Sequence, residues 1–205
     1  KYGSGITHLL ALRHYPAVLI FTAYGLGLTY AERWHDLHSF LRTELPSLGT
    51  DTRSLVSALF LNSWRGGDDR NWQKLEDLHN KKMPLSTHLL QLMTEWRKSF
   101  DGIGIQFPLL MGRFEMIASL AHFESSDVSE LEVAFATYTN GDKFMSIPVG
   151  RVAVDFDVQR PLVQELQSAS MRNSLLDAGF AQGSERKLEL FFENFSRYSE
   201  SMRWL

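Results

Sequence analysis

Apolar residues recur every three or four positions along most of this chain, which is the spacing of one face of an α-helix. In the segment 51–64, for example, Leu55, Leu59 and Phe60 share a face. The strongest stripe of this kind lies between residues 188 and 202. We therefore predict a mainly α fold, an irregular bundle of about eight to ten helices.

The predicted helices extend over the whole chain. They cover residues 6–13, 16–30, 35–45, 51–64, 71–81 and 108–123, a segment that begins at residue 84, a segment after Pro161, residues 171–176 and the C-terminal stripe. Three of them open on a proline, which is well tolerated at the first helical position (Pro16, Pro84 and Pro108).

The passage RHYPAVLIFTAYGLGLTYAERW, residues 13–34, is the most apolar in the chain. Its uncharged run from Pro16 to Tyr30 has 15 residues, whereas a helix that crosses a bilayer needs about 20. A shorter apolar helix with charges close to both ends is typical of a helix buried in protein on most sides. We therefore expect a buried helix and no membrane span.

Gly25 and Gly27 lie inside this apolar helix. Each costs about 1 kcal/mol relative to alanine in a helix interior, and such a cost is usually offset by the close approach of another group. That group is either a neighbouring helix, which we favour, or a ligand. Gly25 and Gly27 are therefore the candidate ligand-binding residues of this helix.

Two stretches have less regular patterns. Residues 127–139 fit both a strand and a helix, and we favour the helix because a serine followed by acidic residues is a good N-cap. Residues 144–156 combine β-branched and aromatic residues with Pro148 and Gly150. This composition predicts a small β element.

The composition excludes several classes of site. The net charge is −3 and no Lys/Arg run exceeds two, so the chain shows no nucleic-acid-binding footprint. Cysteine is absent, which excludes thiolate catalysis and cysteine–zinc sites and fits a reducing compartment. We expect one helical domain over residues 1–205, located in the cytoplasm. The chain starts at Lys1 and ends within a helical pattern, so we also expect a fragment of a larger protein.

Two Glu-x-x-His motifs are the sharpest candidates for chemistry: Glu32 with His35, and Glu76 with His79. On a helix, residues three apart share a face, so that a carboxylate and an imidazole can bind one metal ion. Ferritin-like di-iron bundles add two more carboxylates, which Glu95 and Glu115 could supply, although the order of the motifs along the chain does not match that fold. A metal-dependent enzyme or small-ligand binder is thus the alternative function, and solvated side chains are the simpler interpretation.

The stretch RVAVDFDVQ, residues 151–159, resembles the nucleophile loop of haloacid-dehalogenase-type phosphatases. The resemblance would make Asp155 a nucleophile and Asp157 an acid or base beside Mg²⁺. That family needs a parallel sheet, and no further βα units follow here. We interpret both aspartates as exposed residues, and we predict no catalytic residue and no cofactor.

Two separated passages resemble a group of bacterial proteins. LRHYPAVLIFTAYGLGLTYAERW is similar to their YPALLLLYAGGIAA-type helix, and IPVGRVAV is similar to their PVGRF segment, which a helix-rich tail with an AG-F turn follows. In those proteins this region follows a SIR2-like or nucleotide-handling effector domain, in architectures associated with defence or signalling. The resemblance implies a non-catalytic regulatory, sensing or interaction module. Its expected partners are other domains of the same polypeptide or other proteins, not nucleic acid or a membrane.

Overall fold

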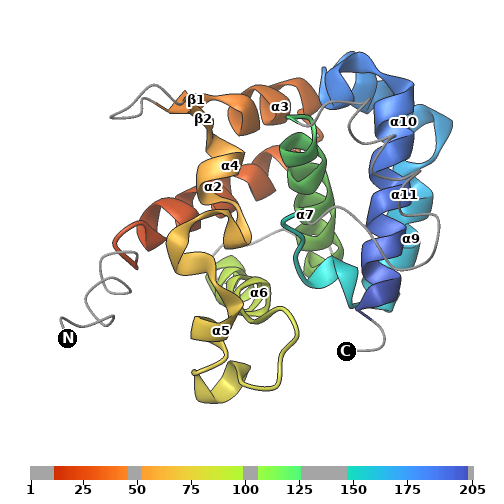
Figure 1. Cartoon of the computed structure of the whole chain (residues 1–205). Helices are drawn as coiled ribbons and strands as arrows, with labels where there is room; N and C mark the ends of the chain where they lie inside the picture. Colours follow the sequence, from red (N-terminus) through yellow and green to blue (C-terminus); the bar gives the residue numbers. More distant parts are fainter. Residues whose placement is uncertain (1–11, 46–51, 99–105, 126–146, 203–205) are drawn as a thin grey trace.

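The computed structural model describes residues 12–45, 52–98, 106–125 and 147–202. In these residues the chain forms nine α-helices, five short 3-10 helices and one small sheet, which confirms the mainly α fold (Figure 1). Almost all of the predicted helix over 6–13 lies outside the described residues, and so does the segment 127–139. Both stay predictions.

The elements follow one another without a repeating unit in the described residues. The α-helices are α2 (Tyr15–Tyr30), α3 (Trp34–Arg42), α4 (Leu55–Leu59), α5 (Asp69–Trp72), α6 (Pro84–Arg97), α7 (Phe107–Phe123), α9 (Phe156–Leu166), α10 (Ala169–Asp177) and α11 (Glu185–Ser201). The 3-10 helices are η1 (Leu61–Ser63), η2 (Arg65–Gly67), η3 (Glu76–Leu78), η4 (Arg151–Ala153) and η5 (Phe180–Gly183). Strands β1 (Glu44–Leu45) and β2 (Arg53–Ser54) pair antiparallel.

The small β element that the structure describes lies at residues 44–45 and 53–54, and the described residues 147–156 contain no strand, whereas the sequence pattern placed the element near 144–156. The described part of that region is coil, followed by η4 and the start of α9. Ser86 Oγ accepts a hydrogen bond from the backbone N–H of Arg151 at 2.8 Å. Glu115 Oε2 accepts one from the N–H of Val152 at 3.2 Å. These side chains satisfy backbone groups that a partner strand would otherwise bind, so no strand is needed there.

The segment 51–81 is less regular than the helical spacing predicted. After α4, Phe60 has an extended backbone conformation and Leu61 a left-handed one, and single 3-10 turns follow. The predicted helix over 71–81 is only the end of α5 and the turn η3. Helical spacing of apolar residues is therefore also met by a series of short turns, which bury Phe60, Trp72 and Leu78 but leave Leu75 exposed.

Helix α9 begins five residues before Pro161, whereas the sequence prediction started the helix after this proline. Asp155 caps the helix, because its carboxylate accepts the N–H of Val158 at 3.4 Å. Pro161 lacks the N–H that would bond back to Asp157, and both residues are exposed. The carbonyl group that loses its partner can therefore reach water, which makes a proline tolerable inside the helix.

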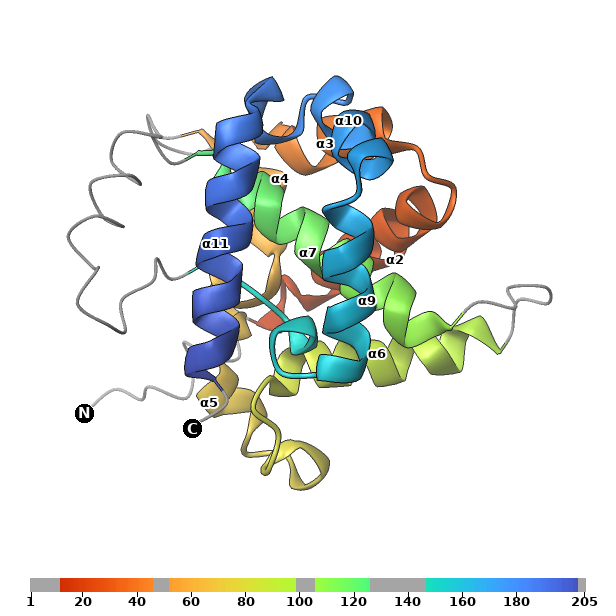
Figure 2. The ribbon, with the colours of Figure 1, turned by 90° about the vertical axis from the view of Figure 1, so that its right-hand side faces the viewer.

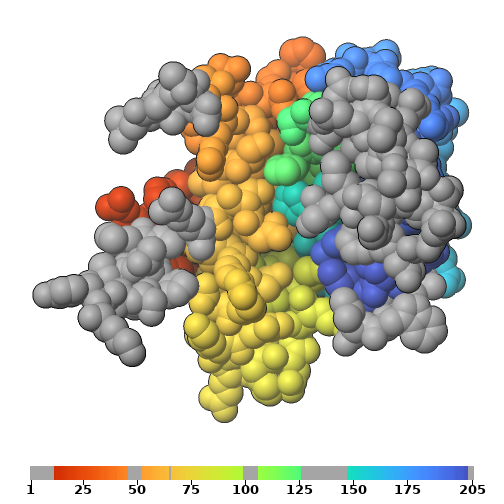
Figure 3. All heavy atoms as spheres, viewed as in Figure 1, coloured from red at the N-terminus to blue at the C-terminus, as the bar shows by residue number. Residues whose placement is uncertain are grey.

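Helix α7 lies at the centre of the molecule. Thirteen of its seventeen residues are buried, and it packs against α2, α3, α4, α6, α9 and α11 (Figures 1 and 2). Among its buried side chains are Phe114, Met116 and Ile117. Helices α5 and α10 do not pack on α7 in this way: α5 packs on α6, and α10 packs on α3 and α9. In the space-filling view, the residues of α4 to α6 form a continuous column beside α7 (Figure 3).

Helix α2 is apolar on both sides, but only one side is buried. The buried residues are Val18, Phe21, Thr22, Gly25, Leu26, Leu28 and Thr29. The two threonine hydroxyls donate to the backbone carbonyls one turn earlier, each at 2.8 Å, which satisfies them without another element. The opposite face is exposed. The predicted burial on most sides is therefore correct for one face and wrong for the other.

None of the helices in the described residues combines the length and the apolar character that crossing a bilayer requires.

Candidate functional site

The four residues of the Glu-x-x-His motifs do not share helical faces. Glu32 has a left-handed backbone (φ 52°) between α2 and α3, and His35 is exposed. Glu76 opens the turn η3, and the Nδ1–H of His79 donates to its backbone carbonyl. Within the described residues no three His, Asp or Glu side chains gather where they could hold a metal ion. The geometry therefore lends no support to the metal-dependent alternative.

The two glycines of α2 have different surroundings. A Cβ atom at Gly25 would overlap the ring of Phe114 on α7, whereas a Cβ atom at Gly27 would have no atom within 4 Å. Gly25 therefore allows α2 and α7 to pack closely, as favoured from the sequence. Gly27 faces outward on the exposed side of α2.

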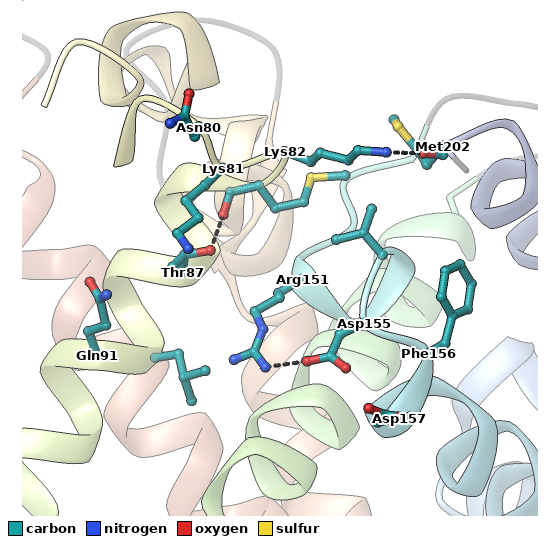
Figure 4. Close-up of a pocket in the computed structure, with 13 residues that line it drawn as sticks. Asn80, Lys81, Lys82, Thr87, Gln91, Arg151, Asp155, Phe156, Asp157 and Met202 are labelled. Carbon is teal, nitrogen blue, oxygen red and sulfur yellow. Dashed lines mark hydrogen bonds and ion pairs between the residues drawn. The ribbon is translucent and has the colours of Figure 1, made fainter. Parts of the chain in front are cut away.

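An open groove of about 770 Å³ lies between α6, the turn before it, the η4–α9 segment and the end of α11 (Figure 4). Lys81, Lys82 and Arg151 line it together with Asp155 and Asp157. Arg151 forms an ion pair with Asp155, and the ammonium of Lys82 donates to a backbone carbonyl of the C-terminal segment at 2.6 Å.

The groove lacks the geometry of a phosphatase nucleophile loop. Asp155 caps α9 and pairs with Arg151, and a 3-10 turn precedes it instead of a strand. Thr87, the hydroxyl-bearing residue of the lining, donates to the carbonyl of Met83 at 2.8 Å. Arg151 and Asp155 pair with each other, and Lys82 bonds to the backbone, so that Asp155 is not held as a nucleophile beside a metal-binding partner.

A buried carboxyl group on α7, that of Glu115, holds the segment after residue 147. The hydroxyl of Ser86 donates to Oε1, and the N–H of Val152 donates to Oε2. Burial raises the pKa of Glu115 to about 7, although the bonds from Ser86 and Val152 and the charge of Arg151 lower it in part. The group is therefore titratable near neutral pH, and it is enclosed by protein.

A second buried carboxylate, that of Glu124, follows α7 directly. Its Oε1 accepts the N–H of Ala181 at 2.8 Å, and its Oε2 lies 3.1 Å from His38 Nε2 and 3.9 Å from Arg42 Nε. The ammonium of Lys187 donates to the backbone carbonyl of Glu124 at 2.6 Å. This network joins α3, the end of α7, the turn η5 and α11.

Besides α2, two segments resemble the bacterial proteins, PVGR and AG-F, and each contacts or leads into a contact with one of these two carboxyl groups. In PVGR, Gly150 packs so closely on the Glu115 carboxylate that a Cβ atom has no room. In AG-F, Gly179 has a φ of +98° and leads into the turn that Glu124 holds. In this structure both segments attach loops to the core. The sequence signal for this role is the presence of a glutamate within the apolar stretch 107–123, Glu115, and of another directly after it, Glu124.

An aromatic pocket of about 490 Å³ lies between the start of α2, α5 and α6. Its walls are the rings of Tyr15, Trp72 and His88, whose centroids lie 5.0 to 5.9 Å apart. The Tyr15 hydroxyl lies 2.5 Å from His88 Nε2. Burial raises the pKa of Tyr15 and lowers that of His88, so both groups are uncharged at neutral pH. Tyr15 and His88 are 73 residues apart in the chain, so no local sequence pattern could predict this pair.

Among the described residues, five of the six exposed large apolar side chains lie in two places, and the sixth, Trp96, stands apart on α6. The six are Leu12, Ile20, Tyr24, Tyr30, Leu75 and Trp96. Leu12 and Leu75 form the rim of the aromatic pocket. Three others, Ile20, Tyr24 and Tyr30, lie on the exposed side of α2, which we call the outer face of α2 together with its small residues Ala17, Ala23 and Gly27.

Comparisons with protein-family models, with characterised proteins and with solved structures found no significant match for this chain. The geometry of the outer face of α2, the aromatic pocket and the groove therefore carries the functional argument.

Proposed function

We propose that this chain is a non-catalytic interaction module of a larger bacterial protein, and that the outer face of α2 docks an apolar helix of another domain of the same polypeptide. The observation that carries the proposal is the exposure of this face. Ile20 is 71%, Tyr24 55% and Tyr30 45% exposed. The bacterial resemblance supports the setting, because in those proteins a region of this kind accompanies an effector domain.

The outer face is suited to permanent rather than transient contact. On a helix, Ala17, Ile20, Tyr24 and Gly27 follow one another at spacings of three and four residues, so they form one continuous strip. The strip contains no charged side chain. Permanent interfaces are more hydrophobic than transient ones, and fully burying a large apolar side chain contributes roughly 1.5–3 kcal/mol.

A helix is the partner that fits this surface best. The backbone N–H and C=O groups of α2 bond within the helix, so the face offers no edge to which a strand could pair. Ala17, Ala23 and Gly27 leave low points between the larger side chains, and no atom lies within 4 Å of a Cβ built at Gly27. The ridges of a second helix can pack into such low points.

Cysteine labelling of the protein as its gene encodes it tests this proposal. This chain contains no cysteine, so Ile20→Cys and Trp96→Cys each place a single new thiol in it. In the structure Ile20 is more exposed than Trp96, at 71% against 42%. If another domain covers the outer face of α2, alkylation measured by peptide mass spectrometry is slower at position 20 than at position 96.

Faster alkylation at position 20 contradicts the proposal, and so does an encoded protein no longer than this chain. Protection of position 20 that disappears on dilution identifies a second copy as the occupant, and this result also rejects docking within one polypeptide.

A further inference from the structure

We propose that the aromatic pocket between α2, α5 and α6 binds a small planar heteroaromatic anion. The inference goes beyond the docking role, and it stands without it, because the pocket and the outer face of α2 share no residue. A volume of about 490 Å³ lies within the range of about 300–1,000 Å³ that is typical of small-molecule sites.

The walls of the pocket favour a flat ring. Tyr15, Trp72 and His88 present aromatic surfaces at one place, and Tyr15 also stacks on the buried Trp64. The indole N–H of Trp72 donates to the carbonyl of Gly66 at 2.8 Å, which fixes the plane of the ring. Aromatic rings that are already held in place lose little freedom when a ligand stacks on them.

The polar atoms in the pocket favour a ring that carries an N–H group. When the Tyr15 hydroxyl donates to His88 Nε2, its oxygen still has a lone pair that can accept a hydrogen bond. Burial keeps both groups uncharged at neutral pH. A purely hydrocarbon ligand would offer no donor to the remaining lone pair of this oxygen and would displace water from it, which is unfavourable.

The charge at the rim favours an anionic ligand. Lys74 is exposed, and its ammonium donates to the side-chain oxygen of Asn71 at 3.0 Å. The lining of the pocket contains no carboxylate, and Lys74 has no ion pair within the described residues. An anionic group attached to the ring would therefore meet a single positive charge where the pocket opens, beside the exposed Leu75.

Titration calorimetry with two matched probes tests the proposal. Indole-3-acetate and indole-3-acetamide have the same ring, and only the first is charged. We expect the unchanged protein to bind indole-3-acetate with a dissociation constant of about 1 mM or tighter, as the size of the molecule allows. Lys74→Ala weakens this binding about twofold to fivefold and leaves binding of the acetamide unchanged. Tyr15→Phe weakens binding of both probes about twofold to tenfold.

Ile20→Ser is the control, because it reduces the exposed apolar surface outside the pocket. Indole-3-acetate should bind this variant as it binds the unchanged protein, and NMR signals of the Trp72 indole and the His88 ring should shift on titration. The proposal is wrong if indole-3-acetate does not bind saturably, if Lys74→Ala affects both probes equally, or if Ile20→Ser abolishes binding. None of these results bears on the docking of α2.

Discussion

Two glycines, which have no side chain, explain much of the close packing around α7. Gly25 on α2 leaves room for the ring of Phe114, and Gly150 leaves room for the carboxyl group of Glu115. In both places a residue of α7 occupies the space where a Cβ atom would stand. The glycines thus mark the positions at which neighbouring elements come closest to the central helix.

The two glycines of α2 form a matched pair for measuring this effect. Alanine has the higher helix propensity, so Gly27→Ala, in open space, should stabilise the protein by about 0.5–1 kcal/mol. Gly25→Ala gains the same propensity but overlaps Phe114, and overpacking should make it destabilising by about 1–3 kcal/mol. Urea unfolding of both variants checks the difference. Equal changes in free energy at the two positions would show that close packing at Gly25 has no energetic role.

The stability of the protein should depend on the protonation of Glu115. Its pKa is about 7 in the folded protein, above the ordinary value of 4.5, so the folded state binds the proton more strongly than the unfolded state. This contribution is fully present below about pH 4.5 and is lost as the pH rises through about 7, with a size on the order of 3 kcal/mol.

Glu115→Gln should remove this part of the pH dependence. Urea unfolding at pH 5 and pH 8 measures it: the variant should lose less stability than the unchanged protein over this interval. Asp69, whose pKa burial raises to about 6, contributes with the same sign to both proteins, and it therefore cancels in the difference. Parallel pH profiles would mean that the Glu115 carboxyl is not held as the structure has it.

At the scale of elements, the turn η5 needs support from outside itself. Gly179, Ala181, Gln182 and Gly183 all have positive φ angles, and for the two that are not glycine a left-handed backbone costs about 1–2 kcal/mol each. The carboxylate of Glu124 accepts the Ala181 N–H, which offsets part of this cost.

Replacing Glu124 should destabilise the turn η5, and the effect should be larger when the acceptor for the Ala181 N–H is also lost. Glu124→Ala leaves the buried N–H of Ala181 without its acceptor and removes the carboxylate beside His38 and Arg42, so it should cost about 1–3 kcal/mol. Glu124→Gln keeps an oxygen for the Ala181 N–H and should cost less. Urea unfolding gives the totals, and amide hydrogen exchange at Ala181 gives the local effect. A Gln variant as unstable as the Ala variant would contradict the role of the Ala181 bond.

For the whole molecule, α7 is the element that joins the early and the late parts of the chain. From the early part of the chain, helices α2, α3, α4 and α6 pack on α7. From the late part, α9 and α11 pack on it (Figure 2). A chain arranged in this way should unfold as one unit. The single helical domain predicted from the sequence implies the same behaviour.

Phe114→Ala tests this cooperativity. Phe114 is fully buried and lies against Phe21 of α2 and Phe60, so its loss should cost about 3–5 kcal/mol. Hydrogen exchange should then accelerate equally for the most protected amides of α3 and α11. Trp96→Ala, at an exposed position, should change stability by no more than about 0.5 kcal/mol. Protection that persists in α9 to α11 alone would show two domains.

The helical class of the fold and the helix starts at Pro16, Pro84 and Pro108 were predictable because they depend on local interactions, whereas the start of α9 before Pro161 was not. Helix α6 begins at Pro84, and Pro16 and Pro108 each stand second in their helices, since a proline favours the first turn wherever the helix later packs. The stretch 71–81 and the element near 144–156 were not predictable in this way. Their patterns fit several local structures, and bonds to distant residues such as Glu115 select among them.

The sequence by itself determined that this chain is mainly helical and that α2 is apolar, because spacing and residue type act within a few positions. It treated Gly25 and Gly27 alike, and the structure shows a close neighbour at Gly25 alone of the two. Only the tertiary structure decided which face of α2 is buried, since both faces are apolar and the position of α7 makes the choice. It also decided that Tyr15 and His88 meet in one pocket. Contacts between residues so far apart in the chain leave no periodic pattern in the sequence.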